Sequence, residues 1–257
     1  MLFVTDLDRT VIHSKKFLGI EKPVKCIERK GNYEISYMTE DALALLDKLK
    51  SKEGLTIIPA TTRALHQFKR VEPFQDLPYA IVANGGTILI HGEKLPEWEN
   101  KIRQIRKDRW QEYMFVEKLL KKYEEYYTQE VTLVDDIFYF TKLEDNKERQ
   151  QELLDKLEKD FKYTRWAFTL QGLKLYIMPK EVSKENALTF LKNYLNENYV
   201  VTAGDGKLDK NFLDLGDRRL VPEQSEVLGY VSNVDNYELV SHGMIGVEEI
   251  FQKLLEC

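Results

Sequence analysis

The strongest constraint on the fold is the N-terminal stretch Leu2–Val4, which is followed closely by Asp6 and Asp8. Three apolar β-formers in a row are typical of a buried strand in a parallel sheet. Carboxylates are costly to bury without partners, so we expect both at the carboxyl end of this strand, where α/β sheets bind ligands. Residues i and i+2 of an extended chain point the same way, so Asp6 and Asp8 face one site.

Two carboxylates at one site can hold a hard cation such as Mg²⁺. They can also divide the work of catalysis, with one ionised as a nucleophile and the other protonated as an acid. Asp-x-Asp is also common in surface turns, and the tripeptide alone favours that simpler interpretation. The preceding strand and the nearby Thr10 favour chemistry, and the decision depends on matching motifs downstream.

A second predicted strand, residues 55–58, leads into Thr61 and then a helical stretch. A hydroxyl beside the amides of a helix N-terminus can bind phosphate, although Thr61 or Thr62 acting as a plain helix cap is the simpler interpretation. A third strand is predicted over residues 79–82, and a later one, residues 199–203, leads into the acidic pair Asp205 and Asp209. Glycines on both sides of Asp205 permit a close backbone turn beside a ligand.

The composition describes an ordinary globular protein: 257 residues, 43% hydrophobic and 32% charged. A net charge of −5 argues against a nucleic-acid or anionic-membrane partner. No apolar run approaches the roughly 20 residues of a membrane helix, and no basic region precedes the first strand, so we expect no signal peptide. With Cys26 and Cys257 as the only cysteines, a reduced cytoplasmic setting is expected. The four histidines are scattered without metal-ligand spacing: His13, His66, His91 and His242.

The pattern of elements predicts an α/β protein with a mostly parallel sheet and an inserted α+β domain. Residues 1–92 and 173–257 are expected to form the core, and residues 93–172 the insertion, which is rich in charge and aromatic side chains. Lys30-Gly31-Asn32 predicts a hairpin turn directly after the first strand. Further predictions are a helix or two over 101–127, a helix over 147–161, late strands near 213–215 and 227–231, and a terminal helix over 247–256.

Four features follow in order along the chain: Asp6 with Asp8, Thr61, Lys184 at a helix start, and Asp205 with Asp209. Together they fit displacement at a phosphoryl group. Mg²⁺ and a lysine would offset the negative charge, a threonine hydroxyl and amides would hold the phosphoryl oxygens, and a carboxylic acid would protonate the leaving group.

At these motifs the chain resembles the haloacid dehalogenase (HAD) superfamily. The matching segments are Asp-Leu-Asp-Arg-Thr, Ala-Thr-Thr-Arg, Ser-Lys-Glu-Asn-Ala and Gly-Asp-Gly-Lys-Leu-Asp. The insertion lies between the second and third motifs. This placement resembles the branch with Cof-type sugar phosphatases, sucrose-phosphate phosphatase and mannosyl-3-phosphoglycerate phosphatase. The resemblance implies a Rossmann-like core carrying a cap domain.

The resemblance also implies a role for each motif residue. Asp6 would be the nucleophile that forms an aspartyl-phosphate, and Asp8 the general acid and then base, with its backbone carbonyl on Mg²⁺. Thr10 would support the loop. The remaining residues bind phosphate or metal: Thr61 on the phosphoryl group, Lys184 on Asp6 and the phosphate, Asp205 as a direct Mg²⁺ ligand, and Asp209 as a ligand through water or a supporting residue.

Three positions depart from the usual family pattern. Arg9 stands where glycine is commonest, and either adds positive charge near the site or points away. Thr62 replaces the usual glycine of the second motif. Leu208 stands where Cof-type members often carry asparagine, which removes a polar contact. None of the three removes a residue that the chemistry requires.

The sequence therefore predicts a Mg²⁺-dependent phosphatase acting on a small phosphorylated metabolite, with a sugar phosphate as the expected class. A phosphomutase using the same aspartyl-phosphate is the alternative among enzymes. A binding or regulatory protein with little turnover is the alternative outside enzymes, although a pure binder would not need the acid Asp8. Exact substrate and oligomeric state do not follow from the sequence.

Overall fold

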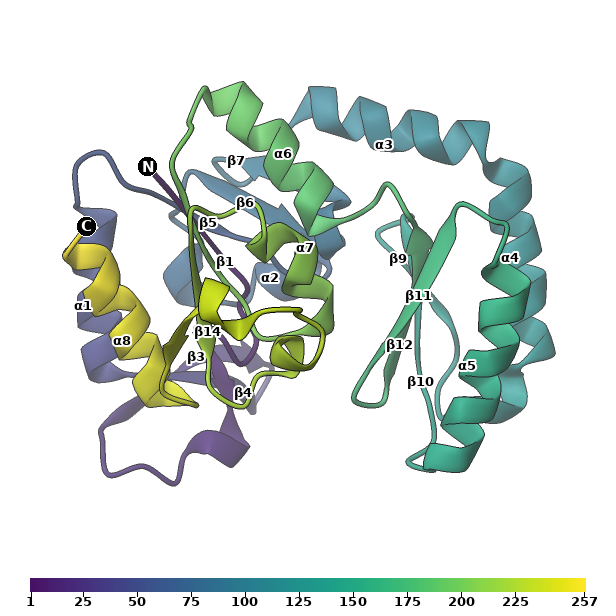
Figure 1. Ribbon diagram of the computed structural model, residues 1–257, viewed down its shortest axis with the longest axis horizontal. Helices are drawn as coiled ribbons and strands as arrows, with labels where there is room; N and C mark the ends of the chain where they lie inside the picture. Colours follow the sequence, from purple (N-terminus) through teal and green to yellow (C-terminus); the bar gives the residue numbers. More distant parts are fainter. The chain divides into compact units, whose positions relative to one another are not determined.

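The computed structural model describes all 257 residues, which form two compact units (Figure 1). The first unit comprises residues 1–95 and 184–257, and the second comprises residues 96–183. None of the helices is both long and apolar enough to cross a membrane.

The first unit is built on a five-stranded parallel sheet with the order β15-β14-β13-β1-β5. Its strands are β1 Leu2–Thr5, β5 Thr56–Pro59, β13 Val200–Ala203, β14 Arg218–Pro222 and β15 Glu238–Val240. Strand β1 pairs on both sides, and all four of its residues are buried. The prediction of an α/β protein with a mostly parallel sheet is confirmed. An isolated bridge between Ala60 and Ile81 adds strand β6, Tyr79–Val82, beside β5.

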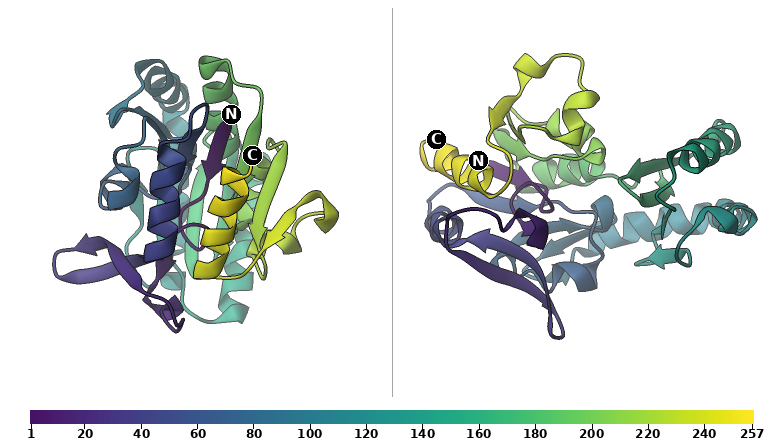
Figure 2. Two further views of the ribbon diagram at one scale, coloured as in Figure 1. Left: turned by 90° about the vertical axis from the view of Figure 1, so that its left-hand side faces the viewer. Right: turned by 90° about the horizontal axis from the view of Figure 1, so that it is seen from below.

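Helices cover both faces of this sheet. The longer ones are α1 Glu40–Lys50, α6 Lys184–Leu195 and α8 Met244–Leu255, and the short ones are α2 Leu65–Phe68 and α7 Lys210–Leu213. Helices α1 and α8 lie side by side (Figure 2), where Leu46 and Phe251 join a buried cluster with Phe3 of β1. Thr39 caps the start of α1, because its side chain accepts a hydrogen bond from the amide of Ala42.

Two small antiparallel sheets complete the first unit. Their strands are β2 His13–Ser14, β3 Val24–Lys30 and β4 Tyr33–Thr39 in one, and β6 Tyr79–Val82, β7 Thr87–Ile90 and β8 Glu93–Lys94 in the other. The β3–β4 pair is the predicted hairpin, and Gly31 takes the positive φ of 59° that its turn requires. The short 3₁₀ turns are η1 Lys15–Phe17, η2 Glu72–Phe74, η3 Ala83–Gly85, η4 Glu124–Tyr126, η5 Lys207–Asp209, η6 Glu226–Gly229 and η7 Val234–Asn236.

The second unit is an α+β body around a four-stranded antiparallel sheet with the order β11-β12-β10-β9. Its elements are α3 Pro96–Asp108, α4 Trp110–Lys122, β9 Thr132–Val134, β10 Phe138–Lys142, α5 Lys147–Phe161, β11 Trp166–Gln171 and β12 Lys174–Pro179. The ring of Trp166 packs edge-on against Tyr113 at 4.7 Å between centroids, in a cluster with Leu153 and Leu157. The helical stretch expected over 101–127 is two helices, which break at Arg109.

The second unit ends later than the sequence analysis placed it. Strand β12 pairs with both β10 and β11, so residues 174–179 belong to the second unit's sheet, and that unit continues to residue 183. Its apolar run resembles a core strand, and local pattern does not reveal which sheet a strand joins.

The predicted late strands near 213–215 and 227–231 are wrong. Leu213 ends helix α7, and Val227 lies in the η6 turn, where both side chains are buried without strand pairing. The observed strands β14 and β15 begin with the charged residues Arg218 and Glu238, so neither shows the apolar run that predicts a buried strand. These two residues pair across the strands, with 2.7 Å between Arg218 Nε and Glu238 Oε1.

A buried imidazole makes the stability of the first unit depend on pH. The ring of His13 packs on Phe17 at 4.8 Å, and burial, with the nearby His242, lowers the pKa of His13 to about 4 from 6.5. Between these values the unfolded chain binds a proton that the folded chain does not, so stability falls as the pH falls.

We expect replacement of His13 by glutamine to remove this part of the pH dependence. Wild-type protein should lose about 2 kcal/mol more unfolding free energy than His13→Gln between pH 7.5 and pH 5. Urea unfolding of both proteins at the two pH values measures the difference. Parallel losses in the two proteins would show that His13 titrates normally in the fold.

Candidate active site

The parallel register brings the ends of three strands to one edge of the sheet. Thr5, the last residue of β1, lies opposite Ala203 of β13 on one side and Pro59 of β5 on the other. The next residue, Asp6, donates its amide hydrogen to the carbonyl of Ala203 at 2.8 Å. The segments that follow these strands carry Asp6, Thr61 and Asp205, so all three lie at the same edge.

The buried ammonium group of Lys184 joins two of the aspartates. Lys184 is the first residue of α6 and is only 2% exposed. Its Nζ lies 2.6 Å from Oδ1 of Asp6 and 2.7 Å from Oδ1 of Asp209. Charge-assisted contacts this short fix the positions of both carboxylates. Three segments that are far apart in sequence therefore meet at one cation.

The second oxygen of Asp209 organises its own loop. Its Oδ2 accepts hydrogen bonds from the amides of Asp205 at 3.1 Å and Gly206 at 2.8 Å. Gly204 lies directly against this carboxylate, since a Cβ built on it would be 2.8 Å from Cβ of Asp209. A glycine is required here because the backbone approaches the side chain too closely for any other residue.

The site contains more negative charge than Lys184 can neutralise. Carboxylate oxygens of Asp6, Asp205 and Asp209 lie within 4.8 Å of one another, and all three residues are buried. Burial, reinforced by the neighbouring carboxylates, raises the pKa of Asp6 and of Asp205 well above the ordinary value. Burial alone would lower the pKa of Lys184, but Asp209 and Asp6 outweigh it and raise that pKa.

Thr61 and Thr10 lie in the turns that follow β5 and β1. Thr61 is fully buried, and its hydroxyl oxygen accepts a hydrogen bond from the amide of Arg63 at 3.1 Å. Its own amide donates to the carbonyl of Ile81 at 2.8 Å. Thr10 is also buried, and its amide donates to the carbonyl of Leu7 at 3.2 Å, which closes the turn that carries Asp8.

Arg9 has a backbone conformation that favours glycine, the residue that the family resemblance led us to expect at this position. Its backbone has a φ of 65°, in the left-handed region that glycine adopts without strain. Its charge also reaches the site, because Arg9 partly offsets the rise in the pKa of Asp205.

The carboxylate of Asp8 is not part of the buried cluster. Its side chain is half exposed and pairs with Arg63 through two contacts, Nε to Oδ2 at 2.7 Å and Nη2 to Oδ1 at 2.8 Å. Arg63 in turn contacts the buried Glu28 of β3. The sequence analysis assigned neither Arg63 nor Glu28 to the site. Arg63 is the last residue of the second motif, but nothing local in the sequence points to Glu28.

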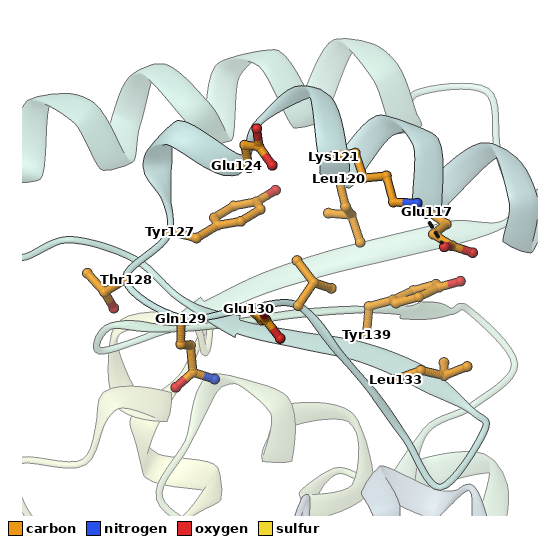
Figure 3. Close-up of a pocket in the computed structure, with 11 residues that line it drawn as sticks. Glu117, Leu120, Lys121, Glu124, Tyr127, Thr128, Gln129, Glu130, Leu133 and Tyr139 are labelled. Carbon is orange, nitrogen blue, oxygen red and sulfur yellow. Dashed lines mark ion pairs between the residues drawn. The ribbon is translucent and has the colours of Figure 1, made fainter.

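The second unit contains a hollow of its own, of about 690 Å³, between α4 and the segment that leads into β9 (Figure 3). Its lining residues come from these elements and from β10: Glu117, Leu120, Lys121, Glu124, Tyr127, Thr128, Gln129, Glu130, Val131, Leu133 and Tyr139. The hydroxyl of Tyr127 is buried there without a hydrogen-bond partner, and burial raises the pKa of Tyr127. None of the motif residues lines this hollow.

An α/β core with an additional α+β unit and a lysine-bridged aspartate cluster at the carboxyl edge of its sheet define the class of HAD-type phosphatases, which are phosphoric monoester hydrolases. The family model described as sucrose-6F-phosphate phosphohydrolase matches residues 1–228. The chain belongs to this family. No curated protein sequence matches the chain significantly.

Solved structures with the same fold align over nearly the whole chain. The sucrose-phosphatase from Synechocystis sp. PCC6803, solved in complex with sucrose and phosphate, has a TM-score of 0.70 at 15% identity and covers 99% of this chain and 97% of its own. SMU.1108c from Streptococcus mutans UA159 has a TM-score of 0.67 at 15% identity, covering 100% and 99%. Protein 0175 of Thermoplasma acidophilum has a TM-score of 0.63 at 14% identity, covering 100% and 98%. At these identities the likeness establishes the fold.

The close approach at Gly204 leads to a prediction about the loop that follows β13. We expect Gly204→Ala to push Asp209 aside and to destabilise the first unit by about 1–3 kcal/mol. Gly229→Ala is the matched control, because a Cβ on Gly229 meets nothing within 4 Å. Urea unfolding compares the two variants, and equal stability would show that the loop absorbs the added methyl group without cost.

Proposed function

We propose that this protein is a Mg²⁺-dependent phosphatase that hydrolyses a small phosphorylated sugar through an aspartyl-phosphate intermediate. The observation that carries the proposal is the buried contact of Lys184 with Asp6 and Asp209 at the ligand-binding edge of the sheet. Membership of a phosphatase family supports it.

The aspartate cluster has the donor set that a magnesium ion prefers. Three buried carboxylates within 4.8 Å offer only hard oxygen ligands, and one lysine leaves their charge incompletely neutralised. We propose that Asp6 and Asp205 hold the ion together with the backbone carbonyl of Asp8. Asp209 is proposed either to bind the ion through a water molecule or to support the residues that bind it directly. When bound, Mg²⁺ would neutralise charge on the carboxylates and the phosphate.

Asp6 is the proposed nucleophile. One of its oxygens is held by Lys184, which orients the carboxylate and offsets the repulsion between it and an incoming phosphate dianion. Attack by the other oxygen forms the acyl phosphate as the ester P–O bond breaks. Thr61 is proposed to bind the phosphoryl oxygens, together with Lys184, at the end of β5.

Asp8 is the proposed acid and base. In the first step its carboxyl group gives a proton to the leaving oxygen of the sugar. In the second step the resulting carboxylate takes a proton from the water that attacks the aspartyl-phosphate, which releases inorganic phosphate and regenerates Asp6. Thr10 is proposed to support the turn that carries Asp8.

A sugar phosphate is the proposed substrate class because of the family match and because a structural relative was solved with sucrose and phosphate. The second unit is proposed to act as the cap that selects the substrate and excludes water when it closes. A net charge of −5 supports a small metabolite as partner and argues against nucleic acid.

Phosphate release from a panel of phosphorylated metabolites tests the proposal, with Asp6→Asn as the control. We expect the wild-type protein to release phosphate from at least one sugar phosphate. Asp6→Asn should lower kcat by about 10³-fold or more, because an amide does not attack phosphorus as a nucleophile, and it should leave the fold intact.

Circular dichroism and thermal unfolding check that the Asp6→Asn variant remains folded. Retained turnover in this variant would remove Asp6 as the nucleophile. Transfer of the phosphoryl group back to a sugar, with a bisphosphate intermediate retained, would indicate a phosphomutase instead.

Asp205→Asn should weaken the response to Mg²⁺ because it removes one negatively charged ligand. We expect the Mg²⁺ concentration for half-maximal activity to rise about tenfold or more. Mg²⁺ should also raise the melting temperature of the wild-type protein more than that of the variant, since a ligand of the folded state stabilises it. An unchanged Mg²⁺ response in both measurements would place the metal site elsewhere.

A further inference from the structure

A carboxylate buried in the β3–β4 hairpin is connected to Asp8 through a single arginine. The side chain of Glu28 is 0% exposed. Its Oε2 lies 2.7 Å from Nη1 of Arg63 and accepts a hydrogen bond from the hydroxyl of Ser36 at 2.6 Å. Its Oε1 lies 3.0 Å from Nη2 of Arg70. All described side-chain contacts of Glu28 are therefore with Ser36 of the hairpin or with these two arginines.

Arg63 bridges the two carboxylates with different nitrogens. Nη1 contacts Glu28, while Nε and Nη2 contact the two oxygens of Asp8. The side chain of Arg63 is only 11% exposed. A guanidinium group is planar and rigid, so holding Nη1 on Glu28 also fixes the plane in which the other two nitrogens meet Asp8.

The charges in this group are balanced. Arg63 pairs with both Glu28 and Asp8, whereas Arg70 pairs with Glu28. Loss of the Glu28 charge would therefore leave Arg63 with only the half-exposed Asp8 and would remove the carboxylate partner of Arg70. Buried ion pairs contribute little net stability by themselves, because the cost of desolvation offsets the attraction. A fully buried carboxylate at this place is therefore better explained by what it positions than by a gain in stability.

We propose that Glu28 is a positioning residue that acts through Arg63 to hold the carboxyl group of Asp8 for proton transfer. This inference rests on the proposed function. As the P–O bond of an alkyl phosphate breaks, the leaving oxygen takes the proton of Asp8, and Asp8 becomes the carboxylate that Arg63 stabilises. Glu28 keeps Arg63 aimed at that carboxylate.

The hydrolysis of an ester whose leaving group needs no proton should not depend on Glu28. p-Nitrophenolate leaves as a stable anion, whereas the alkoxide of a sugar must be protonated as it leaves. The ratio kcat/KM reports the steps up to phosphoryl transfer to Asp6 and excludes the later hydrolysis of the intermediate. Comparing kcat/KM for the two esters thus isolates the proton-donation step.

The test replaces Glu28 by glutamine, which keeps the size of the side chain and removes its charge. We expect Glu28→Gln to lower kcat/KM for the best sugar phosphate by about tenfold or more, and that for p-nitrophenyl phosphate by less than about twofold. Glu34→Gln is the control in the same hairpin, because Glu34 is exposed and pairs with Arg29 rather than Arg63. It should leave both values unchanged.

A double-mutant cycle checks that the effect passes through Asp8. With the sugar phosphate, adding Glu28→Gln to Asp8→Asn should change kcat/KM by less than about twofold, because the group being positioned is already absent. If Glu28→Gln does not fold, Arg63→Lys provides the same test, since lysine keeps the charge but lacks the planar fork. It should show the same selective loss with the sugar phosphate.

Each outcome is decisive. Equal losses with both esters, no loss with either, or additive effects in the cycle would overturn the positioning role of Glu28 while leaving the phosphatase proposal intact. Hydrolysis of neither ester by the wild-type protein would overturn the proposed function and this inference together.

Discussion

The rest of the site depends on the contact of one buried ammonium group with two carboxylates. Lys184 starts α6, Asp6 directly follows β1, and Asp209 lies in the loop after β13, yet Nζ of Lys184 is within 2.7 Å of an oxygen of each aspartate. A buried charge without partners is unstable, so these three residues constrain the packing of α6 on the sheet and also form the proposed reaction site. The structural requirement and the proposed catalytic one coincide here.

The carboxylates of the cluster outnumber the single ammonium group of Lys184, and this imbalance decides which ligands the site favours. One lysine offsets the charge of only one of the three neighbouring carboxylates, Asp6, Asp205 and Asp209. Burial also raises the pKa of Asp6 and of Asp205. A site of this kind favours ligands that bring positive charge, as Mg²⁺ does, and that charge also favours a phosphate beside them. The position of Gly204 against Asp209 shows how tightly the loop is fitted to hold this cluster together.

The β3–β4 hairpin adds a second set of contacts, which reach Asp8 through Arg63. Glu28 and Arg63 are 35 residues apart in the sequence, but the fold brings Oε2 of Glu28 to 2.7 Å from Nη1 of Arg63. Arg63 then carries this constraint to Asp8. The proposed acid would thus be held from the hairpin side, independently of the cluster around Lys184, and the two carboxylates that open the chain would have separate supports.

The sequence alone determined the strands before the aspartate and threonine motifs and the hairpin at Gly31, because apolar runs and turn residues act locally. The four motifs indicated the family. The sequence did not determine the late strands β14 and β15, whose first residues are charged, nor the sheet that β12 joins, because strand partners are chosen by long-range packing. The positions of Asp6 and Lys184 at one site could be predicted from motifs, and their contact of 2.6 Å agrees with that. The link from Glu28 through Arg63 to Asp8 could not, because only the tertiary structure brings residues so distant in the chain within hydrogen-bond range.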